Sequence, residues 1–264
     1  MKNISLNVVM GQMKFRRFPF FWILLQNSHV RMISLFKIIW KGNKLSKYYL
    51  DLDYIIPAID ISEEELKAII AEAESIIAEN KAGSEELAIA YLKKAQCLQK
   101  IKSDIENFED TQCQIKKFIE KAMELSPNMP EALMQMGKWH HINGNFNEAV
   151  NMYTEAIQIK PDYAAAFNNR SIVYSSADLT KAIADITEAI RLRPLDAVYY
   201  FNRGKKYSAL GEHEKAVADF SESIRLRPDQ TRTFLLRGLT YLSAGDKDNA
   251  KMDFDEVLRR KREN

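Results

Sequence analysis

The chain has 264 residues, of which 46% are hydrophobic and 28% charged, so it is long enough for one folded body and an additional segment. Its formal net charge of +2 is unevenly distributed: residues 1–50 carry nine Lys and Arg and no Asp or Glu, whereas residues 51–264 carry a net charge of −7. Because nucleic-acid phosphates are bound by basic surfaces, this acidic body argues against a nucleic-acid-binding function. Two cysteines are too few for a disulfide framework, which favours a reducing compartment, and we expect a cytoplasmic protein.

Residues 14–40 combine cations with apolar runs. The apolar runs at 18–25 and 31–40 are each shorter than the about 20 residues that cross a bilayer, and no small-x-small cleavage site follows them. A basic, aromatic and acid-free composition fits a segment that lies in an anionic membrane surface, as in a peripheral membrane protein. The alternatives are a transit peptide, a disordered leader, or a translation start downstream at Met13 or Met32.

The composition changes at residues 51–60, where the first acidic residues occur, and we place the end of a basic and hydrophobic N-terminal segment, residues 1–60, there. Ser62 and Glu65 then form the S-x-x-E pattern of a helix capping box ahead of an apolar helical period. This pattern predicts a helix over residues 62–80.

A helical hairpin is predicted next. Its first helix spans about 84–102, and its second ends just before Pro127 after a turn about eight residues longer than those further along the chain. Together with the 62–80 helix, which would cover its open side, this hairpin forms a region over 61–129.

Residues 127–264 are organised by an internal repeat. Prolines at 127, 161, 194 and 228 are separated by 34, 33 and 34 residues, and the segments TEAIQIKP, TEAIRLRP and SESIRLRP precede the last three of them. A fixed period of this size is typical of stacked helix–turn–helix units.

We count positions from the first residue of each unit, over 130–163, 164–196, 197–230 and 231–264. The second unit is one residue short in its turn and lacks the glycine of the other turns, so we expect a local distortion there. Four positions hold similar residues in every unit. Position 8 is small (Gly137, Ser171, Gly204, Gly238), position 20 is Ala (Ala149, Ala182, Ala216, Ala250), position 24 is large (Tyr153, Ile186, Phe220, Phe254), and position 27 is Ala156, Ala189, Ser223 or Val257.

This pattern resembles the tetratricopeptide repeat (TPR) family. The resemblance implies an all-α fold, a right-handed α-solenoid, with the 84–127 hairpin as a divergent fifth repeat. Within each repeat we expect the small position 8 to approach the second helix at its Ala at position 20. Arg170, Arg203 and Arg237 at position 7 are in register with Asp185, Asp219 and Asp253 at position 23, and we expect ion pairs that fix the register between helices.

The resemblance also implies a ligand-binding groove lined by positions 2, 5, 6, 9 and 12 of the first helices. The resulting candidate groove residues are Asn169, Asn202, Lys138, His141, Asn168, Phe201, Lys205, Leu235 and Leu239. Asn169 and Asn202 at position 6 resemble a short asparagine ladder, because an amide can both donate to and accept from a peptide backbone. The alternative is that both amides satisfy local polar groups within the protein.

No sequence feature points to catalysis. His140 and His141 are adjacent, so on a helix they point about 100° apart and cannot share a metal ion. We therefore expect a non-enzymatic scaffold without cofactor or metal that binds a protein or peptide partner. A membrane-tethered assembly, secretion or chaperone-type factor anchored by residues 14–40 is the alternative, and self-association through the last repeat is left open.

Overall fold

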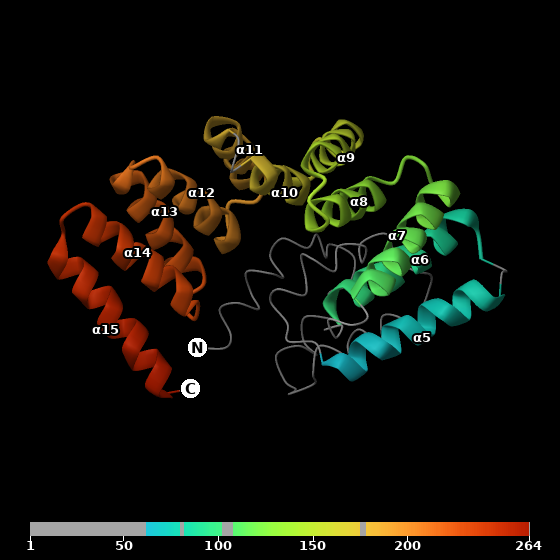
Figure 1. Cartoon of the computed structure of the whole chain (residues 1–264), viewed down its shortest axis with the longest axis horizontal. Coiled ribbons are helices and arrows are strands. Elements are labelled where there is room, and N and C mark those ends of the chain that lie inside the picture. Colours follow the sequence, from blue (N-terminus) through green and yellow to red (C-terminus); the bar gives the residue numbers. More distant parts are fainter. Residues whose placement is uncertain (1–61, 80–81, 102–107, 175–177, 264) are drawn as a thin grey trace, which may run out of the picture. The chain divides into compact units, whose positions relative to one another are not determined.

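The computed structural model describes residues 62–79, 82–101, 108–174 and 178–263, and every regular element in these ranges is an α-helix (Figure 1). The predicted all-α class is therefore confirmed. The segment 14–40 and the predicted boundary at residue 60 lie outside the described residues. Across the described ranges, no helix is both long and apolar enough to cross a membrane.

The helices, in chain order, are α5 (Glu63–Glu79), α6 (Ser84–Lys100), α7 (Phe108–Leu125), α8 (Pro130–Ile142), α9 (Phe146–Ile159), α10 (Ala164–Tyr174), α11 (Leu179–Leu192), α12 (Ala197–Ala209), α13 (His213–Leu226), α14 (Thr231–Ser243) and α15 (Lys247–Glu263).

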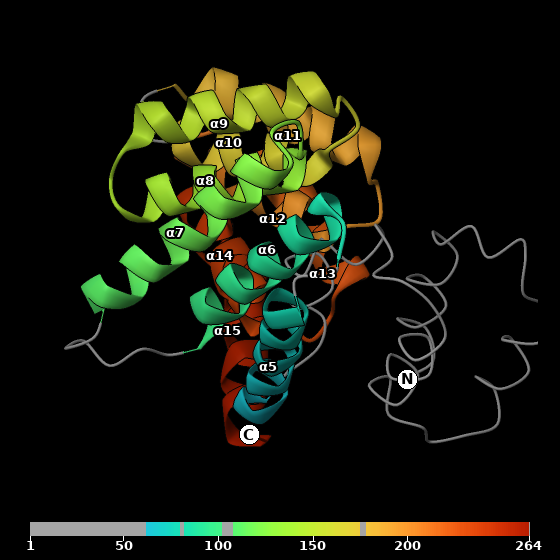
Figure 2. The ribbon, with the colours of Figure 1, turned by 90° about the vertical axis from the view of Figure 1, so that its right-hand side faces the viewer.

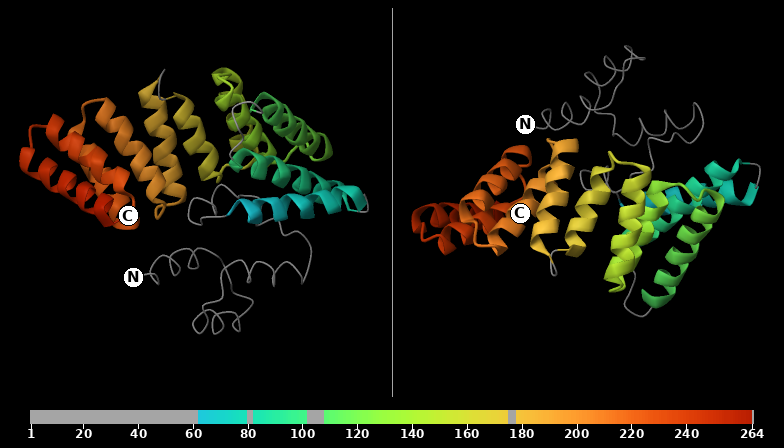
Figure 3. Two further views of the ribbon diagram at one scale, coloured as in Figure 1. Left: turned by 60° about the horizontal axis from the view of Figure 1, so that its bottom comes forward. Right: turned by 90° about the horizontal axis from the view of Figure 1, so that it is seen from above.

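Successive helices pack in pairs, α6 with α7, α8 with α9, α10 with α11, α12 with α13 and α14 with α15. Each pair also contacts the next, through α7 and α8, α9 and α10, α11 and α12, and α13 and α14, so that the pairs follow one another in an α-solenoid (Figures 1 and 3). Helix α5 packs against α6 at the start of this series (Figure 2).

The capping box before α5 is confirmed. The Ser62 backbone N–H donates to Glu65 Oε2 at 3.0 Å, and the Glu65 backbone N–H donates to Ser62 Oγ at 3.3 Å. The two bonds satisfy N–H groups that the first helical turn leaves without a partner. In the hairpin of α6 and α7, Ala95, Ile115 and Ile119 are fully buried.

Three of the turns between paired helices contain a glycine with positive φ: Gly144 at 77°, Gly211 at 76° and Gly245 at 86°. In each turn the residue after the glycine donates its backbone N–H to the carbonyl five residues earlier at 2.9 Å, the bond that closes a Schellman motif. The predicted distortion of the second turn falls on residues 175–177, outside the described residues. Asp178 caps α11 after that turn, with its Oδ1 accepting from the Lys181 backbone N–H at 3.0 Å.

The close approach at position 8 differs from the prediction in its partner. A Cβ added to Gly204 would lie 2.9 Å from Phe220 Cε1, and one added to Gly137 would lie 2.6 Å from Tyr153 Cε1. The residue that position 8 accommodates is therefore the large side chain at position 24. The alanines at position 20 are buried, but they are not the nearest neighbours of position 8. Position 24 is one helical turn after position 20, and its long side chain points back toward the N-terminus of the second helix, so its ring fills the space beside position 8.

Candidate functional site

The first helices of the four regular repeats lie next to one another. Helix α8 contacts α10, and α12 contacts α14, whereas the second helices of the described repeats have no comparable contact with each other. The first helices are therefore the more closely spaced layer. We call the residues at positions 2, 5, 6, 9 and 12 of these helices the first-helix face, of which Glu131, Met134, Gln135 and Asn168 are buried and the others are half-buried or exposed. Its described residues are Glu131, Met134, Gln135, Lys138, His141, Ala165, Asn168, Asn169, Ile172, Val198, Phe201, Asn202, Lys205, Ser208, Arg232, Leu235, Leu236, Leu239 and Leu242.

Polar side chains connect neighbouring first helices at the centre of this face. Asn202 Nδ2 donates to Asn168 Oδ1 at 2.9 Å, and Asn169 Nδ2 lies 3.5 Å from Met134 Sδ. In both contacts position 6 reaches back to position 5 of the preceding repeat. Each contact uses one N–H of the position-6 amide. An asparagine side chain also has a second N–H donor and a carbonyl oxygen acceptor. Asn168 is buried, with only 8% of its surface exposed.

An aromatic ring with two cations lies further along the face. Phe201 on α12 is half-buried, and its ring centroid is 6.1 Å from that of Phe220. Lys205 Nζ lies 5.7 Å from the Phe201 centroid, and Arg232 Cζ, from α14, lies 5.8 Å from it. Both distances are within the range of cation–π attraction, so two exposed cations from different repeats lie against one ring.

Three leucines form an exposed apolar stripe on α14. Leu235, Leu239 and Leu242 are 40%, 45% and 49% exposed and are spaced at i, i+4 and i+7. This spacing places them on one side of the helix. The face therefore carries amide side chains at its centre and an exposed apolar stripe at α14.

On α8, the two remaining candidates, Lys138 and His141, are half-buried. Burial lowers the pKa of His141, whose ring lies 5.9 Å from that of Phe146. Glu131, the acidic residue of this helix, is buried, and its Oε1 accepts from Lys160 Nζ at 2.8 Å.

The predicted Arg–Asp pairs form within each repeat and extend to the repeat before. Arg203 Nε and Nη2 donate to the two carboxylate oxygens of Asp219 at 2.8 Å, and Arg203 Nη1 lies 3.3 Å from Thr187 Oγ1 of the preceding repeat. We call this arrangement of position 7, position 23 and the preceding position 25 the arginine clamp. The equivalent groups are Arg170 with Asp185 and Thr154, and Arg237 with Asp253 and Ser221.

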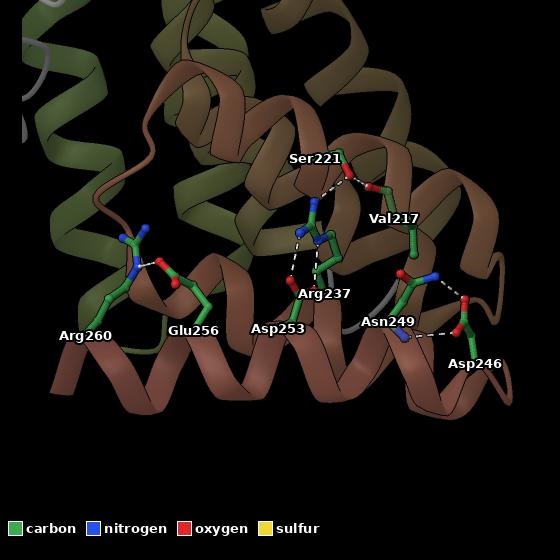
Figure 4. A network of polar contacts seen from close by, with 8 residues as sticks. All are labelled: Val217, Ser221, Arg237, Asp246, Asn249, Asp253, Glu256 and Arg260. Atoms are coloured by element: carbon green, nitrogen blue, oxygen red, sulfur yellow. Dashed lines mark hydrogen bonds and ion pairs between the residues drawn. The ribbon is translucent and has the colours of Figure 1, made fainter. Parts of the chain in front are cut away.

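Figure 4 shows the last of these clamps, with Arg237 between Asp253 and Ser221. Ser221 Oγ itself donates to the Val217 carbonyl at 2.7 Å, so the hydroxyl both donates and accepts. The hydrogen bonds to Asp253 raise the pKa of Arg237. The clamps neutralise the position-7 cations and fix register, so they are part of the scaffold and not of a ligand site.

Sequence reasoning missed two features of the site. The Asn202–Asn168 bond depends on the distance between α10 and α12, which a repeat pattern does not specify. Arg232 is at position 2, one of the ligand-facing positions, and its side chain approaches Phe201 at position 5 of the preceding repeat. This contact also depends on the distance between first helices of neighbouring repeats, which the repeat pattern does not specify. Among the described residues no group of three or more His, Cys, Asp or Glu is placed to hold a metal ion.

Comparisons with known proteins agree with this architecture. A family model described as "TPR repeat" matches residues 137–177, and two described as "Tetratricopeptide repeat" match 197–230 and 231–264. No curated protein sequence matches the chain.

Solved structures of the same fold include three that are less than 25% identical to the chain. MamA is 24% identical, with a TM-score of 0.54 over 62% of this chain and 98% of its own. YrrB is 21% identical, with a TM-score of 0.51 over 71% of this chain and 91% of its own. BtubC from P. vanneervenii is 17% identical, with a TM-score of 0.61 over 76% and 92%. Repeats of this kind generally serve as scaffolds for protein–protein interaction. The matched models, the repeat register and the stacked helix pairs agree, and the chain is a tetratricopeptide repeat protein.

Proposed function

We propose that this protein is a non-enzymatic adaptor that binds a peptide segment of a partner protein on its first-helix face. The observation that carries the proposal is the leucine stripe of α14, in which Leu235, Leu239 and Leu242 remain between 40% and 49% exposed on one side of a helix. Contiguous exposed apolar side chains with polar neighbours mark interaction surfaces in soluble proteins.

Two further features support a peptide as the ligand. The position-6 amides of Asn169 and Asn202 can donate to and accept from a peptide backbone, which fixes the ligand's position without requiring a particular side chain. The stripe of α14 offers the apolar contacts that anchor a helix or an extended segment. YrrB, which shares the fold, is itself described as a TPR protein with an unusual peptide-binding site.

The test is an affinity purification from the native host with four forms of the full-length protein: wild type, Leu239→Glu, Asn169→Ala/Asn202→Ala, and Leu195→Glu as the matched control. Leu195 is 44% exposed but lies in the turn before α12 and occupies none of the positions of the first-helix face. We expect a partner that is recovered with wild type and the control, lost with Leu239→Glu and reduced with the double variant. Recovery of the same partners with all four folded forms, judged by circular dichroism, contradicts the proposal.

A further inference from the structure

We propose that the segment recognised by the first-helix face is acidic as well as apolar, with carboxylates bound by Lys205 and Arg232 and apolar side chains packed on the leucine stripe. This inference rests on the proposed function and names the chemical class of its ligand. The partner is then an amphipathic segment of a protein, rich in Asp or Glu and in Leu, Ile or Phe.

Carboxylates are distributed unequally between the first and the second helices of the repeats. Helices α10, α12 and α14 contain no Asp or Glu, although residues 51–264 as a whole are acidic. The single carboxylate of α8, Glu131, is buried and bound to Lys160. The acidic residues of the repeats lie instead in the segments between helices, at Asp162, Asp178, Asp196, Glu212, Asp229 and Asp246, and on the second helices, at Glu148, Glu155, Asp185, Glu188, Glu214, Asp219, Glu222, Asp248, Asp253, Asp255, Glu256 and Glu263.

The cations on the first helices differ in whether a carboxylate of the protein pairs with them. The clamp arginines are each matched by a carboxylate of their own repeat and present no net charge to a ligand. Lys205 and Arg232 are different, because both are exposed and both lie against the ring of Phe201. Two like charges against one ring repel each other, and a carboxylate that binds either cation reduces that repulsion and forms a charge-assisted hydrogen bond.

These cations adjoin the apolar stripe through Arg232. Arg232 precedes Leu235 by three residues on α14, so Arg232 and the first leucine of the stripe lie within one helical turn of each other. Lys205 lies on α12 against the same ring as Arg232. A ligand that covers the stripe therefore passes the cations. An apolar ligand without carboxylates would desolvate Arg232 without compensation, whereas an acidic one would neutralise it.

Two other occupants fit this surface less well. Residues 1–50 of the chain carry nine cations and no carboxylate, so their charge has the same sign as the pair Lys205 and Arg232. A single-stranded RNA would match the cations, but it has no group that requires three exposed leucines in a row, and nucleic-acid grooves use several cations along the backbone.

The experiment is a selection of peptides from a random displayed library on immobilised full-length protein. The forms compared are wild type, Lys205→Glu/Arg232→Glu, Leu239→Glu, and Lys251→Glu as the control for charge, since Lys251 is an exposed cation on the second helix α15. Affinities of the selected peptides are then measured by fluorescence polarisation, with a fluorescent poly-uridine strand as a separate probe. All substituted side chains are exposed, and circular dichroism checks that each form is folded.

We expect peptides selected on wild type to be net negative and to contain Leu, Ile or Phe. They should bind both Lys205→Glu/Arg232→Glu and Leu239→Glu about tenfold more weakly or worse, and bind Lys251→Glu as they bind wild type. The variant Lys205→Glu/Arg232→Glu, in which both charges are reversed, should select peptides that contain Lys or Arg.

Two outcomes separate the two levels of the proposal. Selected peptides that depend on Leu239 but are neutral or basic overturn this inference and leave the proposed function standing. Selected peptides whose binding is unaffected by every variant of the first-helix face overturn the proposed function itself. Poly-uridine that binds through Lys205 and Arg232 more tightly than any selected peptide also overturns the inference.

Discussion

A single hydrogen atom at position 8 decides how closely the two helices of a repeat approach. Gly137, Gly204 and Gly238 face aromatic rings at position 24, with virtual Cβ distances of 2.6, 2.9 and 2.8 Å. The second regular repeat has a Cβ at position 8, and there the position-24 residue is isoleucine: Ser171 is matched with Ile186. In the predicted divergent repeat, the residues aligned with these two positions are Ala95 and Ile119. The two positions therefore vary together, because their combined volume must fit one space.

This pairing predicts the effect of adding a methyl group at Gly204. The Gly204→Ala change should lower the free energy of unfolding by about 1–3 kcal/mol, despite the better helix propensity of alanine, because the ring of Phe220 is buried and cannot move away. Combined with Phe220→Ile, the same change should be tolerated. The loss of unfolding free energy in the double variant should be at least about 1 kcal/mol smaller than the sum of the losses in the two single variants. Denaturant unfolding of the four proteins measures this coupling, and additive effects would contradict it.

Lys206 is a second residue whose environment predicts a measurable effect. It occupies position 10, where the neighbouring repeats have Val173 and Thr240, and it is only 8% exposed. Burial lowers its pKa from 10.5 to about 8, with a smaller contribution from Lys205. Between these two pH values the unfolded chain holds the proton more tightly than the folded one, so the free energy of unfolding rises as the pH rises from about 8 toward 10.5.

The Lys206→Met variant removes the cost of burying this charge. We expect it to be more stable than wild type by about 1–2 kcal/mol at pH 7, with the advantage shrinking as the pH is raised through this range. Lys251→Met is the control, since Lys251 is exposed on α15 and does not contribute to the pKa of Lys206. Lys93, whose pKa burial also lowers to about 8, is present in all three proteins and cancels in the differences. If Lys206→Met is more stable than wild type by the same amount at every pH, burial does not lower the pKa of Lys206 as proposed.

At the scale of helices, the arginine clamp carries the register of the array. Each clamp joins the first helix of a repeat to its own second helix through a carboxylate, and to the preceding second helix through a hydroxyl. The side chains of Arg203 and Asp219 are 19% and 8% exposed, so this pair is poorly screened by solvent.

We predict that Arg203→Met lowers the free energy of unfolding by about 3 kcal/mol, because it leaves the Asp219 carboxylate buried without its partner. Thr187→Val should cost about 1 kcal/mol, the typical net value of one hydrogen bond. Arg191→Met is the matched control, because its bond to Glu188 is on the surface, and it should cost less than about 1 kcal/mol. Thermal and denaturant unfolding can rank the three, and an equal loss for Arg203→Met and Arg191→Met would refute the assignment.

The helices and the register of the clamps could be predicted from the sequence because both depend on local or periodic patterns. The capping box at Ser62, the buried Ile115 and Ile119, and the pairing of Arg203 with Asp219 follow from spacing alone. The hydroxyl of Thr187 and the Asn202–Asn168 bond could not be predicted, since each depends on the distance between helices of different repeats. The partner of position 8 was predicted at position 20 because small residues suggest contact, whereas the side chain that fills the space comes from position 24.

At the scale of the whole molecule, the charge of the chain is divided between a basic N-terminal segment and an acidic body. The prediction that residues 14–40 associate with membranes concerns residues outside the described part of the chain, and it can be tested directly. The full-length protein should sediment with vesicles that contain anionic lipid and not with neutral ones. The variant Lys14→Glu/Arg16→Glu/Arg17→Glu should lose this binding, because each cation near an anionic surface contributes about 1 kcal/mol.

Lys251→Glu is the control for this prediction, since it changes charge outside the N-terminal segment. Raising the salt concentration should release wild type from the vesicles, as expected for screened charges. Equal sedimentation of wild type and the triple variant would rule out the electrostatic role of this segment.

The arginine clamp also defines which repeats could be copied in tandem. The repeats at 164–196 and 197–230 each supply the arginine, the aspartate and the hydroxyl, so a duplicate of either would complete every bond with its neighbours. The repeat at 130–163 has Met136 and Met152 in place of the ion pair, and the repeat at 231–264 has Asp255 in place of the hydroxyl. In hydrogen-bonding terms the repeats at 164–196 and 197–230 are interchangeable units, whereas a duplicate of the repeat at 130–163 or at 231–264 would lack at least one clamp group.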